Sequence, residues 1–505
     1  KNGSIGSVHD YFFDQSYGKF NLTFDVVGPV TVSKDLAYYG SNDPIYDNDS
    51  NPKDMIIEAC QLVDPIVNFS DYDWDGDGEI DQVFVIYAGY GEHAGAPAET
   101  IWPHESRLGK RAITLDGTII NTYACSCELV GSEGNILTGI GTPCHEFSHC
   151  LGLPDLYDTD YSGAFGMSYW DLMNSGSHSG PTRNGEVPYG YSAYERWFAG
   201  WLEPVELKAT QHIDSMKNLG DTPEAYIIYN MGNRNEYYII ENHQSSRWFS
   251  YVSEYTGMGG LLVSHVNYDK AAWNSNKVNP STSLQRLSII PADNSYGSSE
   301  DELRGDLFPG SKGVTVLSST SHTATGGKLY NKNTDESYNM NRTINRIVEN
   351  IDGTISFDAV FSEYTPTPIS MLPTDITEDG YTANWAGYDN VDSYIVEQQA
   401  FGMNESMRPV MKTQVTEDVH GESLPMKWLV KSGITKYRVK AIVNGFESDW
   451  SGDVEVSRSS NGIHSVSIDN EEEAIYSIDG LKRSHPIKGI NIIKGNGKTR
   501  KILVE

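Results

Sequence analysis

The chain has 505 residues, of which 69 are acidic and 37 are basic, and its formal net charge at pH 7 is −32. This excess of negative charge argues against nucleic acid and anionic membranes as partners, and the sequence holds no run of about 20 apolar residues that could cross a bilayer. The length predicts about three or four domains, and the acidic composition is compatible with calcium binding and an extracellular location.

The first part of the sequence alternates between helical and extended patterns. Residues 10–13 predict a short helix, and residues 19–27, where apolar and polar side chains alternate, predict a half-buried strand. Residues 54–63 carry apolar side chains at helical spacing and predict an amphipathic helix. Residues 82–89 are an apolar run typical of a buried central strand, and residues 113–130 predict two more strands around a turn. We therefore expect an α/β layer in this region.

An acidic segment, residues 73–81, lies between that helix and that strand. Its carboxylates occupy relative positions 1, 3, 5 and 9, with glycine at position 6, which matches the first three-quarters of an EF-hand calcium loop. Position 12 is Phe84 rather than the bidentate glutamate. Crowded carboxylates repel one another unless a cation neutralises them, although a solvated acidic turn is the alternative. The predicted ligands of a structural Ca²⁺ ion are Asp73, Asp75, Asp77, Asp81 and the backbone carbonyl of Glu79.

The segment around His145 has the pattern of a helix that presents metal ligands. Each helical residue turns the chain by about 100°, so His145, Glu146 and His149 fall on one face. Two neutral imidazoles one turn apart suit a tetrahedral Zn²⁺ ion, which keeps one position open when it is catalytic. We expect Thr142 to cap this helix, with Pro143 at its first position.

A catalytic zinc ion needs a third protein ligand. Gly152 can adopt the left-handed conformation that ends a helix, and Pro154 cannot continue one, so the chain can bend and bring Asp155 back to the metal. Glu195, on a later predicted helix, could serve instead. Glu146 is too close in sequence to the histidines to bind the same ion and is predicted to act as the general base.

The five cysteines do not define a disulfide framework, because their number is odd. Cys144 and Cys150 cannot bridge each other within one helix. Cys125 and Cys127 share one side of a predicted strand and could reach the active-site helix, but buried free thiols are an equal alternative. The cysteines therefore leave the compartment undecided.

The motif resembles a known family. Residues 145–155, followed by Trp170-Asp171-Leu172-Met173-Asn174, are similar to the M6 family of secreted bacterial zinc metalloproteases, the immune inhibitor A-like peptidases. Residues 101–104, 192–196, 240–242 and 305–310 extend the similarity over about residues 7 to 360.

That resemblance implies a metzincin-like fold with His145, His149 and Asp155 as zinc ligands and Met173 as an apolar floor beneath the metal. It also implies a signal peptide and an inhibitory pro-segment ahead of Lys1. Some metzincins carry a tyrosine two residues after the methionine of this turn, whereas this chain has Ser175. The residue that steadies the oxyanion therefore has no match in the motif.

The rest of the chain predicts mostly strands. Residues 205–362 alternate short apolar strands with Gly, Asn and Ser, which predicts a β-rich subdomain of the peptidase unit. Residues 363–458 are predicted to form the next domain, and the proline-containing segment 365–368 at its start is predicted to be a linker. The residues after this linker resemble a fibronectin type III sandwich with Trp385 and Tyr437 in its core. Residues 459–505 are similar to short C-terminal sorting segments of exported bacterial proteins; a plain terminal hairpin is the alternative.

These observations predict an α+β multidomain protein with a catalytic domain at residues 1–204. We expect a secreted or cell-surface zinc-dependent endopeptidase of the EC 3.4.24 type, monomeric, that acts on proteins or peptides, with structural calcium and possible attachment through the C-terminal segment. A zinc hydrolase of a cell-wall or glycoprotein amide, and an adhesion protein on a peptidase scaffold, remain alternatives. His104 and His178 are weaker predictions for substrate contact, and His243 and His265 are interpreted as structural.

Overall fold

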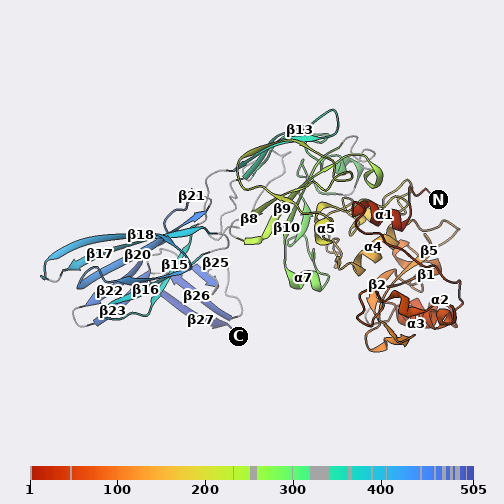
Figure 1. Cartoon of the computed structure of the whole chain (residues 1–505), viewed down its shortest axis with the longest axis horizontal. Coiled ribbons are helices and arrows are strands. Elements are labelled where there is room, and N and C mark those ends of the chain that lie inside the picture. The colour runs from red at the N-terminus through yellow and green to blue at the C-terminus, as the bar shows by residue number, and fades with distance from the viewer. Residues whose placement is uncertain are drawn as a thin grey trace.

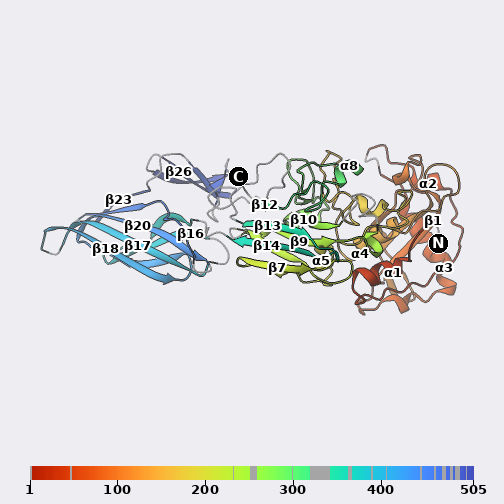
Figure 2. The ribbon, with the colours of Figure 1, turned by 90° about the horizontal axis from the view of Figure 1, so that it is seen from above.

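The molecule is elongated, with the N-terminal region at one end, strands in the middle and a β-sandwich at the other end (Figures 1 and 2). The computed structural model describes residues 3–45, 48–230, 233–250, 259–297, 299–318, 342–361, 367–387, 391–404, 406–443, 446–459, 462–468, 474–477, 482–483, 489–495 and 498–504. None of the helices in these ranges is both long and apolar enough to cross a membrane. Part of the predicted linker, residues 365–366, lies outside the described residues.

The N-terminal region combines helices with a small sheet. Its elements are α1 (Val8–Gln15), α2 (Leu36–Gly40), α3 (Pro52–Val63), β1 (Val83–Tyr90), β2 (His104–Arg107), β3 (Ile113–Leu115), β4 (Thr118–Ile120), β5 (Thr122–Leu129), α4 (Gly141–Cys150) and α5 (Ala193–Phe198). Short 3-10 helices are η1 (Asp64–Ile66), η2 (Phe69–Tyr72), η3 (Glu92–Ala94), η4 (Gly109–Arg111) and η5 (Ser175–His178).

Three strands form the sheet of this region in the order β1-β5-β2, with β1 parallel and β2 antiparallel to β5. α1 and α3 confirm the two helices predicted before β1. α1 begins with a capping box between Ser7 and Asp10 and buries Tyr11 and Phe12, which satisfies its first free N–H groups and anchors it to the core.

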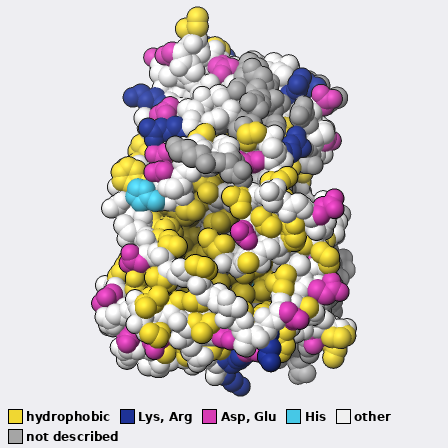
Figure 3. Space-filling model, turned by 90° about the vertical axis from the view of Figure 1, so that its right-hand side faces the viewer, with side chains coloured by type: hydrophobic (Ala, Val, Ile, Leu, Met, Phe, Trp, Pro, Cys, Tyr) yellow, Lys and Arg dark blue, Asp and Glu magenta, His cyan; other side chains and the backbone are white. Residues whose placement is uncertain are grey.

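The prediction that residues 82–89 form a buried central strand is wrong in its position. β1 is an outer strand of the sheet, and Ile86 is 67% exposed. The predicted strand at residues 19–27 does not form either, because that segment runs irregularly and pairs with no strand. A hollow of about 620 Å³ lies between residues 25–36, α3 and β1, and hydrophobic side chains gather around a hollow at this end of the molecule (Figure 3).

The β-rich region consists of two sheets that share one core. Its elements are β6 (Val205–Glu206), β7 (Gln211–Met216), β8 (Tyr226–Asn230), β9 (Asn233–His243), η6 (Arg247–Phe249), β10 (Gly260–Asn267), α7 (Lys270–Asn274), β11 (Leu287–Ile289), α8 (Glu300–Leu303), β12 (Leu317–Ser318), β13 (Arg342–Glu349) and β14 (Ile355–Phe361). The sheet orders are β11-β10-β9-β8-β6 and β12-β13-β14-β7. Side chains of both sheets, such as Ile240 and Phe357, pack in one cluster. The prediction that this region is rich in strands is confirmed.

Two further sheets enclose a separate core. Their strands are β15 (Ile369–Thr374), β16 (Gly380–Ala386), β17 (Ser393–Met403), β18 (Pro409–Val419), β19 (Ser423–Lys427), β20 (Ser432–Val443), β21 (Phe446–Glu447), β22 (Val454–Ser459) and β23 (Gly462–Ile468), in the orders β15-β16-β19 and β18-β17-β20-β22-β23, with β21 paired to β20. Trp385 and Tyr437 lie in this core at 1% and 0% exposure. An all-β module with these two core residues is therefore present, while its fibronectin type III character stays a prediction.

The C-terminal residues form a small sheet of β24 (Ala474–Ser477), β25 (Lys482–Arg483), β26 (Gly489–Gly495) and β27 (Lys498–Val504), in the order β25-β24-β26-β27. β23 lies after residue 458 and pairs with β22 of the preceding module. The division at residues 458 and 459, and the role of the C-terminal segment in sorting, stay predictions.

Candidate metal centre

The helix that carries the histidines is buried along most of its length. α4 begins at Gly141, one residue before the predicted cap, and no side chain caps its first N–H groups. The expectation that Thr142 caps the helix is therefore wrong. A Cβ at Gly141 would lie 1.8 Å from the carbonyl oxygen of Ser177, so only glycine allows α4 to pack this closely against η5. Gly152 has a φ of 91° and ends the helix as predicted.

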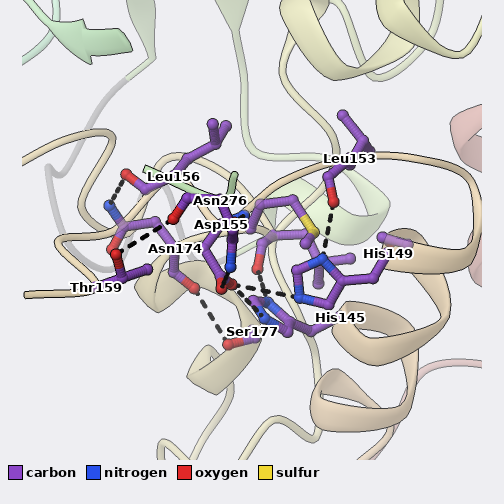
Figure 4. Close-up of polar contacts among 12 residues, drawn as sticks. His145, His149, Leu153, Asp155, Leu156, Thr159, Asn174, Ser177 and Asn276 are labelled. Carbon is purple, nitrogen blue, oxygen red and sulfur yellow. Dashed lines mark hydrogen bonds and ion pairs between the residues drawn. The ribbon is translucent and has the colours of Figure 1, made fainter. Parts of the chain in front are cut away.

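Three side chains converge after that turn. The Nε2 atoms of His145 and His149 lie 3.0 and 3.4 Å from the same oxygen of Asp155, and ligand atoms of all three residues lie within 4.8 Å of one another. Figure 4 shows both rings directed toward this carboxylate. Glu195, the alternative third ligand, is not part of this cluster.

The tautomers of the two histidines suit a metal ion. Nδ1 of His145 donates to the carbonyl oxygen of Leu172 at 3.0 Å, and Nδ1 of His149 donates to that of Leu153 at 2.8 Å, because a carbonyl can only accept. In the neutral rings each Nε2 therefore presents a lone pair. Ligands about 2.05 Å from a tetrahedral zinc ion lie about 3.3 Å apart, which matches the observed separations. The residues present thus fit a mononuclear zinc site.

The electrostatics of the cluster also favour a cation at its centre. Burial disfavours charged imidazoles, but Asp155 outweighs this effect and raises the pKa of His149 to about 9 and that of His145 above its usual value. Burial by itself would raise the pKa of the Asp155 carboxyl. The two imidazoles outweigh burial and hold this pKa well below the usual range. Burial raises the pKa of Glu146, which is 7% exposed. The cluster therefore binds positive charge strongly.

Asp155 is held in place by a residue of the β-rich region. Its backbone N–H donates to Oδ1 of Asn276 at 2.7 Å, and Nδ2 of Asn276 donates to its Oδ2 at 2.6 Å (Figure 4). Asn276 follows α7 and lies 121 positions after Asp155 in the sequence. Partners of this kind orient a ligand and tune its affinity for metal. Sequence reasoning missed Asn276, since no local pattern around it indicates a contact with Asp155.

The turn at Met173 is held by several hydrogen bonds, while its role as a floor beneath the metal stays a prediction. Met173 is fully buried, and its carbonyl oxygen accepts from the backbone N–H of Leu156 at 2.8 Å. Its own N–H donates to Oε1 of Glu195 at 3.3 Å, while Oε2 of Glu195 accepts from Ser192 in the capping box of α5. Glu195 therefore supports this turn and the start of α5.

A cleft passes over the cluster as two lobes. The lobe on one side, about 600 Å³, reaches Thr142, Phe165 and His178 and is called the His178 lobe; the lobe on the other side, about 610 Å³, reaches Glu105 and Trp273 and is called the Glu105 lobe. Both lobes are lined by Trp102, Pro103, His145, Glu146 and Tyr157. A chain lying through both lobes would pass directly over Glu146.

The other predicted histidines have different surroundings. His178 lines its lobe, whereas both ring nitrogens of His104 are engaged, one with the carbonyl of Trp102 and one with Tyr123. His243 contacts the hydroxyl of Tyr189 at 2.6 Å, and His265 lies 2.9 Å from Glu236. His243 and His265 are buried. Neither belongs to one of the two candidate metal clusters found among the described residues.

The acidic segment folds into a compact loop. Carboxylate oxygens of Asp73, Asp75 and Asp77 lie within 4.8 Å of one another. Asp73 accepts from the backbone N–H groups of Gly76 and Gly78 at 2.9 and 3.0 Å, and Asp81 accepts from that of Trp74 at 2.8 Å. The carboxylate of Glu79 instead pairs with Arg107 at 3.0 Å. Three of the predicted calcium ligands are thus close together. The pairing of the Glu79 carboxylate does not bear on its backbone carbonyl, which stays a predicted ligand.

Two imidazoles, one carboxylate and an adjacent glutamate in an open cleft are the arrangement found in metal-dependent hydrolases. Residues 1–201 match the family model of the immune inhibitor A peptidase M6 catalytic domain. Over 215 residues the chain is 33% identical to the pre-pro-metalloprotease PrtV of Vibrio cholerae, and over 233 residues it is 28% identical to immune inhibitor A of Bacillus thuringiensis. Residues 1–201 are therefore similar to the catalytic domain of M6 metallopeptidases.

These similarities cover part of each protein. The matched segments are 38% and 40% of this chain, and they span only 23% of PrtV and 34% of immune inhibitor A. Among solved structures, one titled a myokine structure matches 19% of this chain and 95% of its own chain, at 17% identity and a TM-score of 0.15. That structural match is too weak to carry an argument about the fold.

Proposed function

We propose that this protein is a secreted zinc endopeptidase that hydrolyses peptide bonds of extracellular proteins, with His145, His149 and Asp155 as the zinc ligands. The observation that carries the proposal is the convergence of two Nε2 atoms on one oxygen of Asp155, at 3.0 and 3.4 Å, below an open cleft. When bound, zinc supplies Lewis acidity, which polarises the scissile carbonyl and makes a water molecule acidic near neutral pH.

Glu146 is the proposed general base. It lines both lobes of the cleft beside the metal cluster, so its carboxylate lies within reach of a water molecule that attacks a bound peptide. Burial raises the pKa of Glu146, which strengthens it as a proton acceptor near neutral pH. Glu146 takes the proton of the attacking water and passes it to the amine that leaves.

Tyr157 is the proposed oxyanion-stabilising residue in place of the tyrosine that the sequence lacks at position 175. Its ring lies 6.3 Å from that of His145 and lines both lobes. Burial, followed by the nearby Asp155, raises its pKa well above the usual value, so its hydroxyl keeps its proton. Tyr157 can therefore donate a hydrogen bond to the oxygen on which negative charge develops.

Metal analysis and a catalytic variant test this function together. The purified protein is expected to retain about one zinc ion per chain and to cleave denatured casein. Glu146→Gln should retain the zinc and lose casein cleavage, because Gln keeps the shape of Glu146 and cannot accept the proton. Full activity of Glu146→Gln would remove Glu146 from the mechanism. Cleavage of a cell-wall or glycoprotein amide without casein cleavage would replace the peptidase with the alternative hydrolase.

We also propose that the acidic loop binds a structural calcium ion through Asp73, Asp75, Asp77 and Asp81. The support is the clustering of three carboxylates at the start of the loop, which is costly without a cation. Adding calcium to zinc-loaded protein should raise the melting temperature, because an ion that binds only the folded state stabilises it. Asp75→Asn should weaken this response. An equal calcium response in Asp75→Asn, or no response in the unmodified protein, would refute the assignment.

A further inference from the structure

Glu105 is an acidic residue of the cleft that forms no ion pair with any described residue. It lies on β2, the outer strand beside the cleft, and lines the Glu105 lobe with His149. Its side chain forms no hydrogen bond or ion pair with any described residue. Two cationic side chains act on its pKa, first His149 and then Arg107. Nε2 of His149 faces Asp155 at 3.4 Å, and Arg107 donates to Glu79 at 3.0 Å. Burial raises the pKa of Glu105, as expected for a carboxylate partly removed from water without a partner.

Aromatic side chains also line this lobe. Tyr268, Trp273 and Phe198 line it, and the rings of Tyr268 and Trp273 lie 5.0 Å apart. Nε1 of Trp273 donates to the hydroxyl of Tyr194 at 2.6 Å, which fixes the orientation of the indole. An aromatic surface of this kind can contact the methylene groups of a long side chain and attract a cation at its end.

The charge of the cleft favours a cationic occupant. None of the described residues that line either lobe is Lys or Arg. Four carboxylates line the two lobes, those of Glu105, Glu146, Asp155 and Asp158. A divalent ion at the cluster would balance two of these negative charges and leave two. The net charge of −32 adds a negative field that attracts basic substrates.

We propose that the Glu105 lobe is a subsite for a Lys or Arg side chain next to the cut bond, with Glu105 as the residue that sets this specificity. The proposal rests on the peptidase function proposed above. The aliphatic part of the substrate side chain lies against Tyr268 and Trp273, and its ammonium or guanidinium group pairs with Glu105. A partly buried carboxylate binds a cation more strongly than an exposed one, because the local dielectric is lower. The substrates are therefore basic segments of proteins.

A peptide-library digest with the zinc-loaded protein tests this specificity. We expect Lys and Arg to be enriched at one position next to the cut. Two peptides that carry either Lys or norleucine at this position and are otherwise identical are then compared. For each protein variant, the value of kcat/KM for the Lys peptide is divided by that for the norleucine peptide. Glu105→Gln should lower the ratio of Lys to norleucine by about tenfold or more, which is the effect of losing one charged hydrogen bond. Glu105→Asp should recover part of it, since the charge remains.

A matched control separates specificity from net charge. Glu133 is exposed in a loop outside both lobes, and Glu133→Gln removes the same charge, so its ratio should equal that of the unmodified protein. Cleavage without enrichment of basic residues, or an unchanged ratio in Glu105→Gln, would overturn the assignment of Glu105 and leave the peptidase function intact. Zinc-loaded protein that cleaves no peptide in the library would overturn the proposed function itself.

Discussion

α4 and the loop that follows it bring the proposed ligands to the same point by different means. α4 fixes His145 and His149 through its own geometry, since residues four apart lie on one face. The loop at residues 153–167 contains no helix or strand. Hydrogen bonds from residues of the β-rich region hold it in place. Asn276 bonds Asp155, Asn279 donates to the carbonyl oxygen of Leu156 at 2.8 Å, and Gln285 accepts from residues 165 and 166.

This difference means that the metal centre depends on two regions of the chain. The family model covers residues 1–201, but Asn276, which bonds Asp155, and the other residues that hold this loop lie at 276–285. The β-rich region is therefore part of the structure of the site. A segment cut after residue 204 would keep all three proposed ligands and lose the contacts that orient one of them.

The largest effect is expected at a ligand on α4. His149→Ala removes one of three protein ligands, and the remaining two cannot complete a catalytic zinc site. Zinc should be absent after gel filtration, and casein cleavage should fall below detection. His178→Ala is a useful contrast, because His178 lines the cleft outside the metal cluster. Full zinc retention by His149→Ala would contradict the proposed ligand set.

A smaller effect is expected where the β-rich region supports the loop. Asn276→Ala removes both hydrogen bonds to Asp155 and should weaken zinc binding by about 10- to 100-fold, as measured by competition with a chelating dye. Lys277→Ala is the matched control: Lys277 contacts Asp160 of the same loop at 2.5 Å but no proposed ligand. Equal zinc affinity of both variants would show that Asn276 does not position Asp155.

The same contrast explains which features could be predicted from the sequence. The face shared by His145, Glu146 and His149, the glycine turn at 152 and the α1 and α3 helices depend on spacing within a few residues. The support of Asp155 by Asn276 depends on tertiary packing across 121 positions, which periodicity does not report. The apolar sequence of β1 predicts a central strand, but the position of a strand depends on which strands it pairs with, and β1 is an outer strand. The segment at 19–27 has an alternating pattern and pairs with no strand.

Tyr157 tests whether the loop also contributes to catalysis. Tyr157→Phe keeps the ring beside His145 and removes the hydroxyl, so we expect kcat to fall by about 10²-fold while KM changes little. Zinc content should stay near one per chain. Tyr161→Phe removes a hydroxyl from the same loop, on a side chain that is 75% exposed, and should have a minor effect on kcat. A rise in KM at unchanged kcat would assign Tyr157 to substrate binding instead.

The smallest effect concerns stability at Asp49, which bonds the backbone of Trp102, a residue that lines both lobes of the cleft. Oδ2 of Asp49 accepts from the N–H of Trp102 at 3.0 Å, and its Oδ1 is buried with no partner among the described residues. Burial, with a contribution from Glu92, raises the pKa of Asp49 to about 7, against about 4 in the unfolded chain.

Because the folded state binds the proton more tightly, the contribution of Asp49 to stability is fully present below about pH 4 and is lost as the pH rises to about 7. Asn at this position still accepts from Trp102 and carries no charge. Asp49→Asn should therefore be more stable than the unmodified protein at pH 8 by about 1 kcal/mol, after allowance for solvent screening, and the difference should shrink at pH 5. Denaturant unfolding at both pH values measures it, and an equal difference at pH 5 and pH 8 would rule out titration of Asp49 as the cause.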